Sequence, residues 1–126
     1  MTAPGMRVEI TMSDVAECRV RIAGEIDIAT VGALRTAFAE VLEASAPDRL
    51  VVDLTRVTFL SAAGVRAFVQ VDRRMRSDGA LFVIDPISPV AERVMQACGC
   101  GDLVGTALSA SSGVSRRRRA PRPPWS

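Results

Sequence analysis

Two short apolar runs, separated by a segment with a helical period, limit the folds that are open to this chain. Residues 49–54 have a continuous apolar centre, Leu50-Val51-Val52, and residues 80–84 are apolar throughout. Strands of this kind are typical of parallel sheets that are covered on both faces. Between them lies a helical stripe of apolar side chains, interrupted by Asp72: Val65, Phe68, Val69 and Met75. This alternation of strand and helix predicts an α/β fold with parallel strands.

The flanking segments predict the remaining elements. Residues 6–12 and 18–22 alternate apolar and polar side chains, which indicates an antiparallel hairpin that turns at Ser13-Asp14. The other expected elements are a short strand at 24–28, helices from Thr30 to Pro47, Ala62 to Ser77 and Ser88 to Gly99, and a weak strand at 102–108. Thr30 is the predicted N-cap of the first helix. We therefore expect one domain, residues 1–109, with a mixed, mostly parallel sheet, an N-terminal hairpin and helices packed on it.

The end of the chain differs in composition from the rest. Residues 116–126 carry five arginines and no acid, whereas the first 115 residues hold eleven arginines against fourteen acids, a net charge of −3. The segment 110–126 has too little apolar surface to offset its ordering entropy, so we expect a disordered tail. The folded part is acidic and its sequence shows no basic stripe. We therefore expect no specific nucleic-acid binding.

The composition argues against several classes of function. There is no histidine, the three cysteines are an odd number, and neither GxxxxGK[ST] nor GxGxxG occurs. We therefore expect no enzyme, no cofactor and no metal site. No apolar run approaches the roughly 18 residues of a membrane span, and the N-terminus does not have the pattern of a signal peptide. We expect a cytoplasmic protein that does not enter the membrane.

Two loops are candidates for a binding site. Residues 24–30 lead into the first predicted helix, and residues 58–64 lead into the second. In parallel sheets, ligands and partners meet the loops beyond the carboxyl ends of the strands. Right-handed crossovers place both loops at the same edge of the sheet.

Several segments of the chain, in order and spacing, resemble STAS domains, specifically anti-sigma factor antagonists. They are Gly24-Glu25-Ile26-Asp27, Val52-Asp53-Leu54, residues 57–65 and residues 84–89, and the resemblance spans about residues 6–108. It implies a bacterial regulator of transcription that works by partner switching. Such a protein binds an anti-sigma factor, often one that is also a serine kinase, and thereby frees the sigma factor.

The resemblance also implies a partner-binding site. Its residues are Asp27, Ser61, Ala62, Ala63, Gly64 and Arg66. We expect the protein to be a monomer or a weak dimer.

The chain differs from the family in the loop that is phosphorylated in family members. The kinase phosphorylates the second serine of an Asp-Ser-Ser-Gly loop, and the added charge disrupts docking. Here the loop reads Ser61-Ala62-Ala63-Gly64, so the acceptor position is Ala63, which has no hydroxyl. Ser61 has three interpretations: a helix N-cap, a substitute phospho-acceptor or a direct partner contact. Ala62, Ala63 and Gly64 also fit a first turn that packs close to the sheet, and Asp27 and Asp53 fit either partner contacts or loop anchors.

Three functions remain open. The leading hypothesis is an anti-sigma factor antagonist that lacks the usual phospho-acceptor serine. The alternatives are a non-phosphorylatable STAS scaffold that binds another regulator, and a small enzyme or nucleotide-binding module on the same scaffold.

Overall fold

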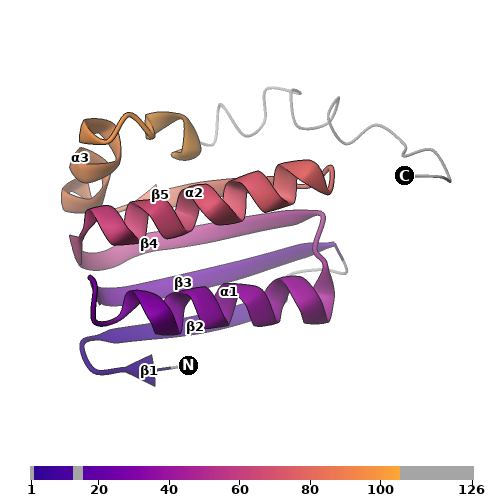
Figure 1. The fold of residues 1–126 in the computed structure, drawn as a ribbon, viewed down its shortest axis with the longest axis horizontal. Coiled ribbons are helices and arrows are strands. Elements are labelled where there is room, and N and C mark those ends of the chain that lie inside the picture. The colour runs from indigo at the N-terminus through magenta and orange to yellow at the C-terminus, as the bar shows by residue number, and fades with distance from the viewer. Residues whose placement is uncertain (1, 13–15, 106–126) are drawn as a thin grey trace, which may run out of the picture.

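A five-stranded sheet, in the order β1-β2-β3-β4-β5, forms the body of the molecule (Figure 1). The structure is a computed structural model that describes residues 2–12 and 16–105. The strands are β1 (Thr2–Ala3), β2 (Met6–Met12), β3 (Glu17–Ile26), β4 (Arg49–Leu60) and β5 (Leu81–Ile87). The first three pair antiparallel, and β3, β4 and β5 pair parallel. The mixed sheet with an N-terminal hairpin is therefore confirmed.

Helices α1 (Val31–Ser45) and α2 (Ala62–Ser77) lie side by side on one face of the sheet (Figure 1). Helix α3 (Pro89–Ala97) follows β5 and contacts β4. A short 3-10 helix, η1 (Gly101–Leu103), follows α3. The core fills the space between helices and sheet. At its centre Phe38 of α1, Phe68 of α2 and Phe82 of β5 contact one another, with ring centroids 6.1 to 6.4 Å apart. The sequence prediction of α2 from Ala62 to Ser77 is confirmed.

Strand β4 is longer and less regular than its sequence suggests. At two places β4 has one residue more than the segment of β3 that it pairs with. The first lies between the pairs Arg21–Asp53 and Ala23–Arg56, and the second between the pairs Gly24–Val57 and Glu25–Phe59. An extra residue in one strand moves the following side chains to the other face of the sheet. The buried side chains of this half are therefore spaced by three: Leu54, Val57 and Leu60.

Two expectations about the strands need correction. The short strand predicted at 24–28 is the end of β3, which stops at Ile26. The predicted final strand, 102–108, begins instead with η1, because the N–H groups of Leu103 and Val104 bond to the carbonyls of Cys100 and Gly101 and not to β5. It then has a single bridge to β5, between Val104 and Ile84. Residues 106–108 of that strand, and the tail predicted at 110–126, lie outside the described residues.

Candidate functional site

The loop between β3 and α1 is closed by its own side chains. Asp27 Oδ1 accepts hydrogen bonds from the backbone N–H groups of Ala29 at 2.9 Å and Thr30 at 3.1 Å. The Thr30 hydroxyl donates to the carbonyl of Glu25 at 2.9 Å and accepts from the N–H of Asp27 at 2.9 Å. Asp27 is therefore an anchor of its own loop. Thr30 is the N-cap residue of α1, as predicted, but its side chain makes no cap hydrogen bond, because its buried hydroxyl is engaged with the residues before the helix.

The loop between β4 and α2 is a capped helix start. Ser61 is the N-cap of α2, and its Oγ accepts a hydrogen bond from the N–H of Gly64 at 3.3 Å. Its carbonyl accepts from Val65 N at 3.1 Å, the first turn of the helix. The N-cap interpretation of Ser61 is confirmed, and this hydrogen bond uses one lone pair of the Ser61 hydroxyl oxygen.

The two loops meet at one edge of the sheet, as the sequence predicts. Ser61 N donates to the carbonyl of Ile26 at 2.9 Å, which ties the start of α2 to the end of β3. Gly64 lies against the same residue: a Cβ built on it would be 2.6 Å from Ile26 Cγ2 and 2.7 Å from Leu60 Cδ1. Glycine at position 64 therefore lets α2 begin close to the sheet.

A third loop joins this edge. The Ser88 hydroxyl, which is buried, donates to the carbonyl of Val57 at 2.7 Å and accepts from the N–H of Ala91 at 3.3 Å. Ser88 thereby caps α3, as predicted, and holds the end of β5 against β4. The loops that follow β3, β4 and β5 are thus joined by hydrogen bonds into one surface.

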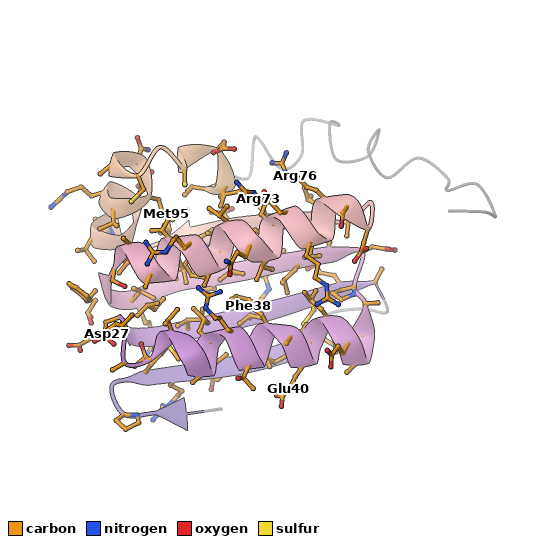
Figure 2. The ribbon with its side chains drawn as sticks, viewed as in Figure 1. Asp27, Phe38, Glu40, Arg73, Arg76 and Met95 are labelled. Atoms are coloured by element: carbon orange, nitrogen blue, oxygen red, sulfur yellow. The ribbon has the colours of Figure 1, made fainter. Side chains whose placement is uncertain are left out.

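The predicted site residues differ in their access to a partner. Ala62 and Arg66 are exposed, and Asp27 and Ser61 are half-buried at the edge, where Figure 2 labels Asp27. Ala63 and Gly64 are buried within the first turn of α2, which agrees with the close-packing interpretation.

Asp53 lies apart from this edge. It is within the sheet, where it pairs with Arg21 Nε at 3.6 Å and accepts from the N–H of Thr55 at 2.9 Å. Its contacts are those of a structural anchor in β4.

Sequence reasoning missed three exposed apolar side chains at the same edge. They are Ile28 in the loop after β3, Phe59 near the end of β4 and Val90 in the first turn of α3, and their exposed fractions are 79%, 48% and 37%. We call these three residues the apolar edge. Ile28 could have been identified as an apolar residue inside a polar loop, but Phe59 could not, because the irregular pairing of β4 hides which of its residues face solvent. Exposed apolar side chains gathered at a hydrogen-bonded edge are typical of protein-binding sites.

The described residues supply few groups for other chemistry. Residues 2–12 and 16–105 contain no cluster of three or more cysteine, aspartate or glutamate side chains placed to hold a metal ion. Within the same residues no helix is both long enough and apolar enough to cross a membrane.

The packing of Gly64 leads to a stability prediction. Gly64→Ala should destabilise the domain by about 1–3 kcal/mol, because its Cβ would force the side chains of Ile26 and Leu60 to move. The matched control is Gly32→Ala in α1, where a Cβ meets no atom within 4 Å and should stabilise by up to about 1 kcal/mol. Urea unfolding measures both changes. Equal effects of the two substitutions would contradict the close approach of α2 to β3.

Comparison with known proteins agrees with this geometry. The family model described as "Mlab, STAS domain" matches residues 10–105. The anti-sigma factor antagonist SpoIIAA in its unphosphorylated form has a TM-score of 0.71 at 19% identity, covering 92% of this chain and 100% of that chain. An anti-sigma factor antagonist from Mycobacterium paratuberculosis has a TM-score of 0.71 at 26% identity, covering 90% and 98%. The phosphorylated form of SpoIIAA, a Bacillus cell fate determinant, has a TM-score of 0.62 at 21% identity, covering 86% and 99%. The chain therefore belongs to the STAS domain family.

Proposed function

We propose that this protein is an anti-sigma factor antagonist, which binds an anti-sigma factor at the edge where β3, β4 and β5 end and so regulates transcription in the bacterial cytoplasm. The family and the likeness to two antagonists support this proposal. In our proposal the protein acts by binding alone and is not an enzyme.

The observation that carries the proposal is the apolar edge itself. Ile28, Phe59 and Val90 come from three separate segments, and the hydrogen bonds of Ser61 and Ser88 hold those segments together. A surface that is already ordered loses little conformational entropy when a partner docks, and apolar side chains supply most of the binding free energy of such contacts. Exposed Ala62 and Arg66, in the first turns of α2, extend the proposed contact onto that helix.

The proposed antagonist lacks the usual switch. Ala63 occupies the position of the phospho-acceptor serine, has no hydroxyl and is 8% exposed. The two forms of the similar SpoIIAA, one phosphorylated and one not, show that phosphorylation occurs in that protein. In this chain we propose that docking persists in the presence of a serine kinase. The same alanine favours a second function, a non-phosphorylatable STAS scaffold that binds a different regulator.

The apolar edge can be tested by substitution. The purified protein is titrated against each purified anti-sigma factor of its own organism, with affinity measured by calorimetry. Ile28→Asp and Phe59→Asp should each weaken the binding more than about tenfold, because each places a charge in an apolar contact.

The chain offers matched controls for these substitutions. Ile10 and Met12 of β2 are 42% and 47% exposed but lie at the opposite end of the sheet, where Met12 pairs with Cys18 at the start of β3. Ile10→Asp and Met12→Asp should leave the affinity unchanged. Failure of the wild-type protein to bind any of the anti-sigma factors would refute the proposed function and favour the scaffold.

The missing hydroxyl gives a second prediction. Incubation with ATP and an anti-sigma factor of the kinase type should add no phosphate to the wild-type protein, as measured by intact-mass spectrometry, and should leave the complex intact. Ala63→Ser restores the hydroxyl, and this variant should gain one phosphate and bind more weakly afterwards. A phosphate on the wild-type protein that disappears in Ser61→Ala would instead identify Ser61 as the acceptor.

A further inference from the structure

A groove runs along one side of α2, and no residue of α1 lines it. It has a volume of about 360 Å³ and lies between α2 and the turn that follows α3. The residues that line it are Ala62, Val65, Arg66, Val69, Gln70, Arg73, Cys98 and Cys100. The α2 residues follow the three- and four-residue spacing of one helix face. Because Ala62 and Arg66 also belong to the candidate site, the groove continues that site along the helix. We call it the α2 groove.

The α2 groove is basic although the domain is acidic. The described residues hold 11 arginines against 13 acids, a net charge of −2, yet α2 alone carries four arginines against Asp72, a net charge of +3. Asp72 is paired with Arg76, whose Nε lies 3.0 Å from its Oδ2. No carboxylate lines the groove, and among residues 2–12 and 16–105 no carboxylate pairs with Arg66 or Arg73. Figure 2 shows Arg73 on the side of α2 that faces α3. The expectation of no basic stripe in the folded part therefore does not hold for this face.

The groove also has an apolar floor. Val65 is buried, Val69 is half-buried, and the exposed methyl group of Ala62 begins the groove at the N-terminus of α2. At the rim, Gln70 accepts a hydrogen bond from Arg35 of α1, so this edge of the groove is the one nearest α1. An apolar floor between arginines matches a segment that carries apolar side chains on one side and carboxylates on the other.

We propose that the α2 groove binds an acidic, amphipathic segment of the anti-sigma factor, an inference that rests on the proposed function. Charge complementarity and continuity with the apolar edge select this occupant. A nucleic acid fits less well, because its evenly spaced phosphates would also meet the remaining surface of the described domain, whose net charge is −5 when α2 is left out.

Two cysteines in the groove report whether it is occupied. Cys98 is exposed and Cys100 is half-buried, so both thiols can be reached by an alkylating reagent. Cys18 is fully buried, and burial raises the pKa of its thiol, which keeps it protonated and unreactive. Cys18 therefore serves as an internal reference in the same molecule.

The test uses the full chain and a purified anti-sigma factor that binds it. The doubly substituted Arg66→Glu, Arg73→Glu protein should bind about tenfold more weakly or worse, and the wild-type affinity should fall steeply with added salt. Partner binding should slow the alkylation of Cys98 in the wild-type protein. The control is the doubly substituted Arg7→Glu, Arg56→Glu protein, which has the same change of charge. These two arginines lie on the face of the sheet that α1 and α2 do not cover, and among the described residues neither forms an ion pair. This variant should keep its affinity within about twofold.

The outcomes separate this inference from the proposed function. Binding that survives Arg66→Glu, Arg73→Glu but is lost in Phe59→Asp would overturn the groove proposal and leave the proposed function standing. If no anti-sigma factor binds, the proposed function fails, and a synthetic helical peptide of glutamate and leucine becomes the probe. Slower Cys98 alkylation with this peptide, but not with its lysine counterpart, would support the groove chemistry. No protection by the peptide, or equal protection by single-stranded DNA, would overturn it.

Discussion

The hydrogen bond from Ser61 N to the carbonyl of Ile26 is the contact on which the rest of this structure depends. It joins the start of α2 to the end of β3, and it can form because Gly64 has no Cβ to hold the helix away from Ile26 and Leu60. The same contact brings the two loops of the candidate site together and sets the direction in which α2 leaves the sheet. Both the apolar edge and the α2 groove follow from that direction.

Much of the fold could be predicted from the sequence because local patterns decide it. The capped start of α2 at Ser61 and the capped start of α3 at Ser88 are local signals, and both are confirmed. The second half of β4 could not be predicted, because its two irregular pairings with β3 space the buried residues by three. That spacing resembles neither a regular strand nor a helix. The side chain of Thr30 shows the same limit, since its partners are Glu25 and Asp27, which precede the helix.

For the candidate site, the location of the two loops could be predicted from the sequence, but the exposure of the side chains around them could not. Both loops and the edge they share follow from the topology rules of parallel sheets, whereas the exposure of Ile28, Phe59 and Val90 depends on packing. The basic groove was missed because its two walls, α2 and the turn at Cys98 and Cys100, are distant in sequence. In our proposal the protein is an antagonist with a constant docking surface, because Ala63, at the proposed acceptor position, has no hydroxyl.

The most direct measurement of the central claim is hydrogen–deuterium exchange of the full chain, alone and with the proposed anti-sigma factor partner. Partner binding should slow exchange at the ends of β3 and β4, in the first two turns of α2 and in the first turn of α3. These segments surround the apolar edge and open into the α2 groove. Slower exchange at β2 and the C-terminal turn of α1, with these segments unchanged, would show that the partner docks at the opposite end of the sheet and would contradict the account.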